Sequence, residues 1–597
     1  MPDATRETLI ETLEQIATLL ELKGENPFKI RAYRTGAETV RTYPGDFLQL
    51  ARDNQLEGIK GIGDALREKL HTLAATGELP FLESLKAEFP DTIFELFDIS
   101  GLGAKKISAL YRELGVGSIA DLKKACESGE AAKLSGFGGK TAAKLLEAIS
   151  SRTTYADTFR VDQVAPAARE ILDYLRGHPD TSRAEVAGSF RRGRETVHDL
   201  DFLVATRKPA AIMEAFIIPP WVESVISSGP TKTSVRLHSG VQCDLRAVTN
   251  AEFPFALAYF TGSKEHNIQL RARALKHGWT LNEYRFAPTG EASPEVPDEI
   301  YEEADIHRAL GLEFIDPALR EGAGEIEAAG KGTLPKLIEL ENLRGTFHNH
   351  TTASDGHATL REMAEAAMEL GFEYLGIADH SKSSFQANGL DETRLRKQLD
   401  EIRALNAEYT PDFRLFAGSE VDILKDGSLD FPDRLLAELD YVVASVHSVF
   451  NLPELEMTAR LIRAIENPHV TMLGHLTGRL LLKRGAYALN LPAILDACAA
   501  NGTLIELNAN PRRLDMDWRW WRMAQEKGIG CSINPDAHTT HGLQDLWYGV
   551  RTARKGWLTR KDVINCLPLG HVEEALARKR RRANRRRDGS CIGGGTG

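Results

Sequence analysis

The sequence lacks the features of a membrane-bound or secreted protein. Among its 597 residues no apolar run approaches the length that spans a bilayer, and Met1 to Glu11 are polar and charged rather than basic and then apolar. The six cysteines have no paired spacing, which argues against a disulfide framework and against a cysteine-type zinc finger. We therefore expect ordinary thiols, a cytoplasmic location and no membrane partner.

The sequence also lacks the positive net charge that is usual in DNA-binding proteins, since its formal charge is −11. Acidic groups that hold metal ions count in this sum although bound ions offset them, so the positions of the basic residues are more informative. The densest basic cluster is followed by a glycine-rich end. We expect residues 578–597 to be a disordered basic tail that is either simply solvated or in electrostatic contact with nucleic acid.

A short apolar-Gly-x-Gly pattern occurs three times in the amino-terminal quarter, each time before a segment of helical periodicity that carries Lys or Arg. Glycines bring backbone amides close to a ligand, and a helix start adds unpaired N–H groups. One such turn is more often a plain connector, but three of them favour sequence-independent binding of DNA phosphates. They resemble helix-hairpin-helix motifs. The glycines are Gly61, Gly63, Gly101, Gly103, Gly136 and Gly138.

Two carboxylates stand two residues apart at the start of an apolar run rich in strand formers. Side chains two apart on a strand share a face, so Asp199 and Asp201 are predicted to project together while Leu200 points into the core. Asp244 lies on the polar side of a second alternating run, which reads as a neighbouring strand. Three carboxylates can hold two Mg²⁺ ions, which activate a primer 3′-hydroxyl and stabilise a pyrophosphate leaving group.

The motifs around these carboxylates make the pattern specific, because Asp-x-Asp alone is common at solvated strand ends. Gly188-Ser189 precedes them, and the segment from Tyr259 to Ser263 follows, with Asn267 and Arg271 after it. This ordered set resembles the family X polymerases typified by eukaryotic DNA polymerase beta, over roughly residues 5 to 320. The resemblance implies template-directed nucleotidyl transfer from deoxynucleoside triphosphates onto gapped or nicked DNA.

The resemblance also implies roles for single residues. Asp199 and Asp201 would hold both Mg²⁺ ions, and Asp244 would complete the catalytic ion's site and take the primer's proton. Gln242 departs from the family pattern, because the beta-type enzymes carry arginine there, and this puts the conformational control of the carboxylates in doubt. The expected nucleotide and DNA contacts are Gly188, Ser189, Arg192, Tyr259, Phe260, Gly262, Asn267 and Arg271.

Residues 28 to 34 resemble the 5′-phosphate-binding segment of the lyase domain in these polymerases, which makes Lys29 and Tyr33 expected DNA contacts. Lys69 falls where that domain places its Schiff-base lysine, a nucleophile toward an abasic sugar if its pKa is lowered. Ala65, however, stands where a phosphate-binding lysine is expected, and Lys69 also lies on a hairpin helix where a lysine would simply contact DNA. Lyase activity therefore stays an open alternative.

After residue 340, short apolar runs alternate with helix-like segments, and each run ends in a residue type that binds metals. In a parallel β/α barrel all strand carboxyl ends lie at one mouth, so these residues would converge there. Mixed imidazole and carboxylate ligands favour Zn²⁺, Mn²⁺ or Fe over Mg²⁺, and a bridging carboxylate such as Glu420 leaves room for more than two ions. The residues are His348, His350, Asp379, His380, Glu420, His447, His475, Asp536 and His538.

This segment resembles the PHP (polymerase and histidinol phosphatase) family, with every ligand position present. The resemblance adds Asp355 to the expected ligands and leaves out Asp379, so the expected set is His348, His350, Asp355, His380, Glu420, His447, His475, Asp536 and His538. In bacterial polymerases the resemblance implies Mn²⁺-stimulated 3′-5′ exonuclease activity, with abasic (AP) endonuclease and 3′-phosphatase activities as further options. We expect up to three Mn²⁺ or Zn²⁺ ions. Arg512 and Arg513 are expected either to contact the substrate phosphate or to be exposed loop arginines.

These motifs predict a multidomain fold, because one hydrophobic core cannot serve so long a chain. We expect an α-helical helix-hairpin-helix region, an α+β nucleotidyltransferase palm and thumb, and a carboxyl-terminal distorted β/α barrel of TIM-like type. The expected boundaries are 1–85 for a lyase-like domain with the first hairpin, 86–154 for a fingers-like domain with two hairpins, 155–250 for the palm, 251–321 for the thumb, 322–340 for a linker, 341–577 for the PHP domain and 578–597 for the tail.

We therefore predict a monomeric DNA repair polymerase that fills short gaps and processes 3′ ends through its PHP domain. One alternative is a DNA-binding scaffold with silent centres, against which the intact ligand sets argue. The other is a small-molecule phosphatase of histidinol phosphate type with a DNA-binding appendage. The three hairpins and the palm carboxylates argue against that second alternative.

Overall fold

The structure, a computed structural model, describes residues 5–43, 47–59, 61–77, 79–99, 102–134, 136–155 and 157–576. Gly101 and the expected basic tail lie outside these residues. The chain divides into two compact units, residues 1–156 and residues 157–597. Within the described part, no helix is both long and apolar enough to span a lipid bilayer. The cysteines in that part are all buried and free, as the sequence predicts.

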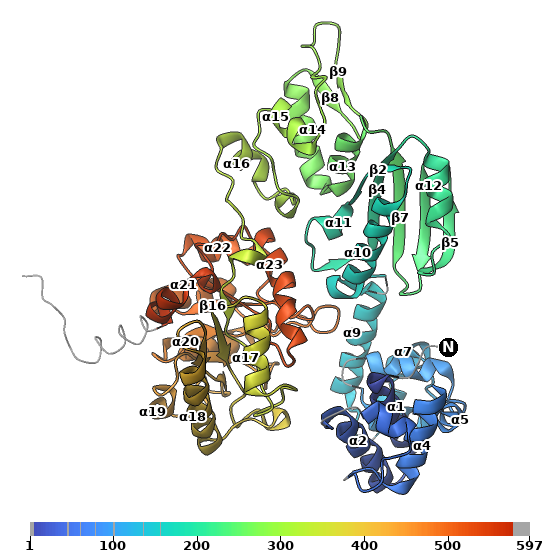
Figure 1. The fold of residues 1–597 in the computed structure, drawn as a ribbon, viewed down its shortest axis with the longest axis vertical. Helices are drawn as coiled ribbons and strands as arrows, with labels where there is room; N and C mark the ends of the chain where they lie inside the picture. Colours follow the sequence, from blue (N-terminus) through green and yellow to red (C-terminus); the bar gives the residue numbers. More distant parts are fainter. Residues whose placement is uncertain are drawn as a thin grey trace, which may run out of the picture. The chain divides into compact units, whose positions relative to one another are not determined.

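The first unit is helical (Figure 1). Its long first helix packs along the second and contacts the later helices, and side chains such as Leu13, Ile16, Leu70 and Leu110 form one core. The elements are α1 (Arg6–Lys23), α2 (Pro27–Thr42), α3 (Phe47–Arg52), α4 (Asp64–Thr76), α5 (Pro80–Lys86), η1 (Asp91–Asp98), α6 (Ala104–Leu114), α7 (Ile119–Glu127), α8 (Glu130–Lys133) and α9 (Gly139–Tyr155).

The second unit begins with a mixed five-stranded sheet in the order β2-β4-β7-β6-β5, which is the palm (Figure 1). Its strands are β2 (Thr181–Val186), β4 (Asp199–Thr206), β5 (Val222–Ser228), β6 (Lys232–Leu237) and β7 (Gln242–Val248), and a short pair, β1 (Phe159–Arg160) and β3 (Thr196–Val197), lies beside it. Leu200, Phe202 and Val204 of β4 face a core shared with α10 (Val161–Gly177) and α12 (Pro209–Phe216). Because side chains alternate along a strand, Asp199 and Asp201 lie on the opposite face.

That opposite face carries helix α13 (Phe253–Thr261), which packs on Leu203 and Ala205 farther along β4. The thumb region follows with α14 (Lys264–Lys276), β8 (Trp279–Leu281), β9 (Phe286–Pro288), α15 (Glu303–Ala309) and η2 (Pro317–Leu319). Residues 322–340, expected to be a linker, differ from that expectation. They contain helix α16 (Glu325–Lys331), and the buried Glu325 side chain is hydrogen-bonded to His266 at 2.8 Å. The segment is thus packed structure rather than a free connection. Its Gly-rich composition suggested a linker, because composition does not show that Glu325 is buried.

The carboxyl-terminal region is a distorted barrel of parallel strands. One sheet holds β10 (Gly345–Thr346), β11 (Tyr374–Ile377) and β12 (Arg414–Ala417), and the other holds β13 (Glu420–Asp422), β14 (Val443–Ser445), β15 (Met472–Leu473), β16 (Leu504–Asn508) and β17 (Cys531–Asn534). Parallel bridges from His380 to Glu420 and from Asn349 to Ala537 join the two sheets at both edges. All strand ends that carry predicted ligands therefore face one mouth.

Helices alternate with these strands and surround them (Figure 1). Helix α17 illustrates why they form: Thr359 and Glu362 make a reciprocal capping box, and Met363, Ala364 and Ala367 follow at helical spacing on the buried face. The helices are α17 (Leu360–Glu369), α18 (Glu392–Tyr409), α19 (Asp433–Leu436), α20 (Glu454–Glu466), α21 (Leu491–Asn501), α22 (Trp521–Glu526) and α23 (Leu546–Lys555), with η3 (Leu340–Asn342), η4 (Phe385–Ala387), η5 (Trp518–Trp520), η6 (His541–Asp545) and η7 (Ile564–Cys566).

Candidate functional site

The palm carboxylates lie on two adjacent parallel strands. Asp199 and Asp201 begin β4, and Asp244 on β7 is the register partner of Asp201. Burial, reinforced by the charges of Asp199 and Asp244, raises the pKa of Asp201 to about 7. Burial and Asp244 also raise the pKa of Asp199. The carboxylates therefore destabilise one another's charge, and a divalent cation would relieve this repulsion.

Asp244 has polar partners of its own. Lys232 Nζ on β6 lies 2.8 Å from Asp244 Oδ2, and Gln242 Nε2 donates to Asp244 Oδ1 at 2.9 Å. Although burial opposes it, hydrogen bonds from Lys232, Gln242 and Ser234 lower the pKa of Asp244. Gln242, which stands where the beta-type polymerases carry arginine, thus contacts Asp244 directly. Among the described residues, the groups whose ligand atoms all lie within 4.8 Å of one another are in the barrel and not in the palm.

A tight turn sits directly over the palm carboxylates. Gly188 begins the short helix α11 (Gly188–Arg191) with φ +62°, and a Cβ at this position would lie 2.2 Å from Asp201 Oδ2. Only glycine fits such an approach. After the turn, Arg192 donates from Nε to Glu321 at 3.0 Å and from Nη1 to the Thr261 carbonyl at 2.5 Å. The turn therefore brings the backbone at Gly188 close to Asp201, while Glu321 and Thr261 hold the guanidinium of Arg192.

The other predicted nucleotide contacts lie together near Arg192. Gly262 is so close that a Cβ there would be 3.2 Å from Arg192 Nη1. Tyr259 and Phe260 are in edge contact, and Asn267 donates to the Tyr259 carbonyl at 2.7 Å. The guanidinium of Arg271 lies 5.8 Å from the centre of the Tyr259 ring.

Helix α23 of the barrel donates hydrogen bonds to the backbone of this turn. Arg551 donates to the Phe190 carbonyl at 2.5 Å, and Lys555 donates to the Arg192 carbonyl at 3.1 Å. Lys555 also pairs with Glu321, the carboxylate that holds Arg192. The sequence contains no motif for this contact, because these basic residues lie on an ordinary helical face far from the palm in the chain.

The barrel ligands converge at the mouth of the strands. Three overlapping groups have ligand atoms within 4.8 Å of one another, and His475 Nε2 lies 2.9 Å from Glu420 Oε1. The groups are His350, Asp355, His380 and His538; His348, His350 and Asp536; and His380, Glu420 and His447. All nine predicted residues are therefore in one cluster.

Glu420 is at the centre of this cluster. It is fully buried, and imidazole nitrogens of His348, His380, His447 and His475 lie 2.9 to 3.3 Å from its oxygens. Although burial opposes it, His447, His348 and His380 hold the pKa of Glu420 well below its usual range. A carboxylate kept ionised among imidazoles is suited to bridge cations.

The donor atoms of the cluster fit metal ions. Buried atoms without a hydrogen-bond partner include His348 Nε2, His350 Nδ1, His380 Nδ1 and Glu420 Oε2. Unpaired polar atoms in a protein interior are costly unless a ligand satisfies them. In addition, His475 and Asp536 have φ values of +26° and +55°, a strained backbone that is typical of functional positions.

Two positioning carboxylates are absent from the sequence prediction. Glu506 on β16 accepts from His348 Nδ1 at 2.6 Å, and Asp422 on β13 accepts from His447 Nδ1 at 2.6 Å. Such contacts orient an imidazole and fix its tautomer. A polar residue inside the apolar β16 run was the available signal. Of the two arginines, Arg513 Nε lies 3.5 Å from Asp536 Oδ2, whereas no such contact to a ligand is seen for Arg512.

Most of the described glycines in the hairpin turns of the first unit have open surroundings; the exception is Gly61, where a Cβ would lie 2.3 Å from Thr39 Oγ1. Gly63 and Gly103 cap the starts of α4 and α6, Gly138 immediately precedes α9, and Gly61 and Gly136 have φ values of +94° and +85°. A Cβ at Gly63, Gly103, Gly136 or Gly138 would meet nothing within 4 Å. The turns thus leave room for a ligand, while Gly101 lies outside the described residues.

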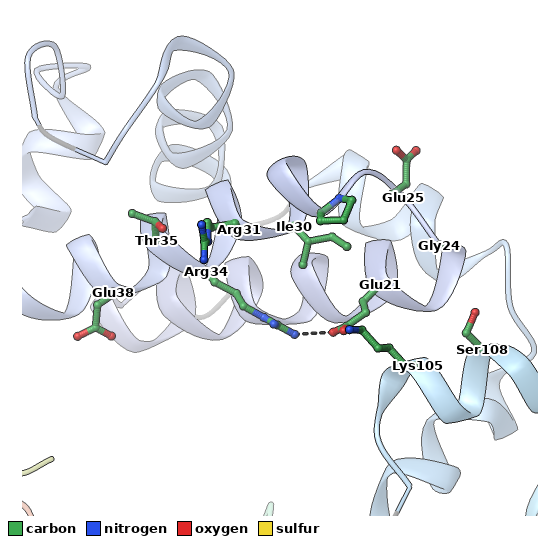
Figure 2. A pocket seen from close by; sticks show the side chains of 11 residues that line it. Glu21, Gly24, Glu25, Ile30, Arg31, Arg34, Thr35, Glu38, Lys105 and Ser108 are labelled. Atoms are coloured by element: carbon green, nitrogen blue, oxygen red, sulfur yellow. Dashed lines mark hydrogen bonds and ion pairs between the residues drawn. The ribbon is translucent and has the colours of Figure 1, made fainter. Parts of the chain in front are cut away.

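The predicted lyase residues are more mixed. A pocket of 730 Å³ lies between α1, α2 and α6, and Arg34 Nη2 in it bonds Glu21 at 2.5 Å. Figure 2 shows this pair with Lys105 nearby. Lys29 lies 3.5 Å from Glu25, and Tyr33 is 5% exposed and stacked with Phe81. The ring of Tyr33 is therefore mostly inaccessible to DNA. Lys69 donates to the Ala65 carbonyl at 3.2 Å and lies over the Phe81 ring.

Family models match four parts of the chain. The DNA polymerase beta thumb matches residues 256–321, and the PHP domain matches residues 346–510. A helix-hairpin-helix domain matches residues 4–79, and a SAM-like helix-hairpin-helix tandem matches residues 93–151.

Curated relatives agree with this division. The chain is 40% identical to the DNA polymerase/3'-5' exonuclease PolX of Bacillus subtilis (strain 168) over 577 residues, which are 96% of this chain and 99% of that protein. It is 27% identical to a probable phosphatase of Thermoanaerobacter sp. (strain X514), covering 39% of this chain and 95% of that protein. A probable phosphatase of Clostridium acetobutylicum is 31% identical over 32% of this chain and 78% of that protein.

Proposed function

Because this chain belongs to the bacterial family X DNA polymerases with a carboxyl-terminal PHP domain, we propose that its palm and its barrel are two separate metal-dependent centres for DNA synthesis and 3′-end removal. The chain is thus a DNA polymerase and a 3′-5′ exonuclease. Its substrates are deoxynucleoside triphosphates and DNA. We further assign it gapped DNA as the preferred substrate, a monomeric state and, since it acts on DNA, a place in the cytoplasm.

In the palm, we assign Asp199, Asp201 and Asp244 as ligands of Mg²⁺, which when bound supplies charge neutralisation at the transferring phosphates. Asp244, which Lys232 and Gln242 hold in place, would accept the proton of the primer 3′-hydroxyl. The turn at Gly188 and Ser189 binds the triphosphate through backbone amides and Arg192.

The neighbouring contacts select and orient the nucleotide. Tyr259, Phe260 and Gly262 contact its sugar, Asn267 reaches the base edge and Arg271 the template. Their proximity to Arg192 and to one another supports this assignment.

In the barrel, the nine clustered residues would hold Mn²⁺ or Zn²⁺, which would supply an activated water for attack on phosphorus. Glu506 and Asp422 orient His348 and His447, and we assign Arg513, 3.5 Å from Asp536, as a contact of the substrate phosphate. The observation that carries this proposal is the clustering of nine residues from all along the barrel, with the buried Glu420 at their centre.

The test is the separation of the two activities. Asp199→Ala is expected to lower primer extension about a thousandfold or more, because a centre that loses a metal ligand loses several kcal/mol of charge stabilisation. It is expected to spare exonuclease activity, because that activity is assigned to the other centre. His348→Ala is expected to do the reverse and to lower the metal content of the purified protein. Primer extension and release of 3′-labelled nucleotides are measured for both variants.

Two exposed residues provide matched controls, Asp173→Ala on α10 and His571→Ala near the end of the described chain. Neither is expected to change either activity. Equal loss of both activities in Asp199→Ala or His348→Ala would contradict two independent centres.

A further inference from the structure

A short excursion of the chain stands at the rim of the barrel's metal-ligand cluster. It leaves the barrel at His380 and returns at Leu390, whose N–H donates to the His380 carbonyl at 2.7 Å. Ser381 pairs with Leu390 in a parallel bridge and donates from its N–H to the Glu420 carbonyl at 3.0 Å. Both ends of the excursion are thus fixed to residues of the ligand cluster.

Side-chain bonds hold the middle of the excursion against the cluster. Ser384 Oγ donates to Asp422 Oδ2 at 2.8 Å and lies 3.3 Å from His447 Nδ1. Ser383 bonds Asp430 through its N–H at 2.7 Å and through its hydroxyl at 2.6 Å. Asp422 is the carboxylate that orients His447. The residue that follows Ser384 is therefore held in a fixed position next to the cluster.

That residue is Phe385, which is 88% exposed and is the most exposed large apolar side chain among the residues that the structure describes. Single exposed apolar residues are common on protein surfaces and by themselves carry no meaning. Phe385, however, stands on a fastened loop at the mouth of the cluster, between the exposed polar residues Lys382 and Gln386. An exposed aromatic ring is a surface on which an unpaired base of single-stranded nucleic acid can stack.

We propose that Phe385 is a stacking platform for the unpaired 3′-terminal base of a DNA strand whose last phosphodiester lies at the barrel's metal ligands. This inference rests on the proposed exonuclease function of the barrel and adds a residue that positions the DNA strand there. The ring's π-face accepts any base, so Phe385 would hold the terminal base without reading sequence.

The first experiment measures exonuclease kcat/KM of the full chain with Mn²⁺ on a 3′-labelled single-stranded oligonucleotide. Phe385→Ala is expected to lower kcat/KM about tenfold, mainly through KM, since stacking acts on binding. Phe385→Trp is expected to retain the activity because a larger ring still stacks. Leu455→Ala removes another highly exposed apolar side chain, from α20, and serves as the matched control with no expected change.

A second substrate separates stacking from a structural effect. On an oligonucleotide whose 3′-terminal residue is a tetrahydrofuran without a base, the wild-type chain and Phe385→Ala are expected to have the same kcat/KM. A binding readout accompanies it: in Phe385→Trp, addition of an oligonucleotide ending in a normal base is expected to quench the added tryptophan fluorescence, and the base-free end is expected to quench it much less. Gap filling reports whether each variant is folded.

Equal kcat/KM of Phe385→Ala and the wild type on the normal substrate would overturn the stacking proposal. The same loss on both substrates would overturn it too, because it would indicate a distorted cluster. If the wild-type chain degrades neither oligonucleotide, the proposed exonuclease function itself is wrong, so the two failures are distinguishable.

Discussion

The residues around a metal-binding side chain affect how tightly that side chain binds the ion. His348 could in principle rotate or change tautomer, but Glu506 is fully buried and accepts from its Nδ1, which leaves Nε2 directed toward Glu420. Although burial opposes it, the His348 charge lowers the pKa of Glu506. Glu506 also accepts from the His475 amide at 2.6 Å, so one carboxylate orders two ligands.

Glu506→Gln is therefore expected to weaken metal binding at the barrel about 10- to 100-fold, because an amide orients an imidazole less strongly than a carboxylate. The check is Mn²⁺ titration by calorimetry, together with the Mn²⁺ dependence of exonuclease activity. Glu526→Gln, at an exposed position on α22, is the matched control. Unchanged Mn²⁺ affinity in Glu506→Gln would remove Glu506 from the ligand-orienting role.

At the scale of elements, the starts of the hairpin helices are the features that suit DNA phosphates. The turns before α4, α6 and α9 combine open glycines with free helix amides, and Lys105 and Lys140 are exposed in the first turns of α6 and α9. Backbone amides at such a turn can bind one phosphate, and a lysine beside them adds a charge that would release counterions.

Lys105→Ala and Lys140→Ala are each expected to weaken DNA binding equally for all sequences. Each should lower the magnitude of the slope of log K against log salt concentration by about 0.9, because one phosphate contact is lost. Fluorescence anisotropy with duplex DNA over a salt series measures this. Lys123→Ala, exposed on α7 and away from the turns, should leave the slope unchanged; the opposite pattern would argue against phosphate binding at the turns.

Helix α15 is joined to α11 through one buried carboxylate. Glu303 pairs with Arg191 and with Arg320 at 2.6 Å each. Although burial opposes it, Arg320 and Arg191 lower the pKa of Glu303 to about 2. The folded pKa lies below the unfolded value, so the pair stabilises the fold above the ordinary carboxyl pKa, and this stabilisation is lost as pH falls toward 2.

Glu303→Gln is expected to lower the free energy of unfolding by about 3 kcal/mol at neutral pH. The difference from the wild type should shrink as pH falls from about 4.5 toward 2. Urea unfolding at several pH values, followed by circular dichroism, measures it. A difference that stays constant between pH 5 and pH 3 would contradict the ion-pair origin of the stability.

At the scale of the second unit, the barrel is in direct contact with the turn that begins at Gly188 and ends at Arg192. Lys555 on α23 is fully buried, and burial, partly offset by Glu321, lowers its pKa to about 8. Glu321 is shared between Lys555 and Arg192, the residue assigned to the triphosphate. Through Lys555, the barrel thus affects how strongly Glu321 binds Arg192 and competes with the phosphates of a nucleotide for it.

Lys555→Met is expected to raise KM for deoxynucleoside triphosphates, because Glu321 is left to Arg192, and to lower stability by about 3 kcal/mol, because a buried ion pair is broken. Exonuclease activity should change little, since α23 carries none of the clustered ligands. Gap-filling kinetics and urea unfolding measure both effects. Restored KM in Lys555→Arg would support the shared-carboxylate explanation, whereas an unchanged KM in Lys555→Met would contradict it.

The sequence by itself determined the family and its two activities, as the similarity to the Bacillus subtilis protein and the thumb and PHP matches confirm. It could do so because local patterns carry this information. Alternation along a strand places Asp199 and Asp201 on one face, and strand ends in a parallel barrel meet at one mouth whatever their separation in the chain.

Only the tertiary structure decided which side chains support these centres. Glu506, Lys232 and Lys555 act on residues far away in sequence, and no local period reports such contacts. The same reason explains why the expected linker contains the buried Glu325 and why Tyr33 packs into the core. A side chain's burial and partner depend on which elements pack against it, which is a property of the whole fold and not of the neighbouring residues.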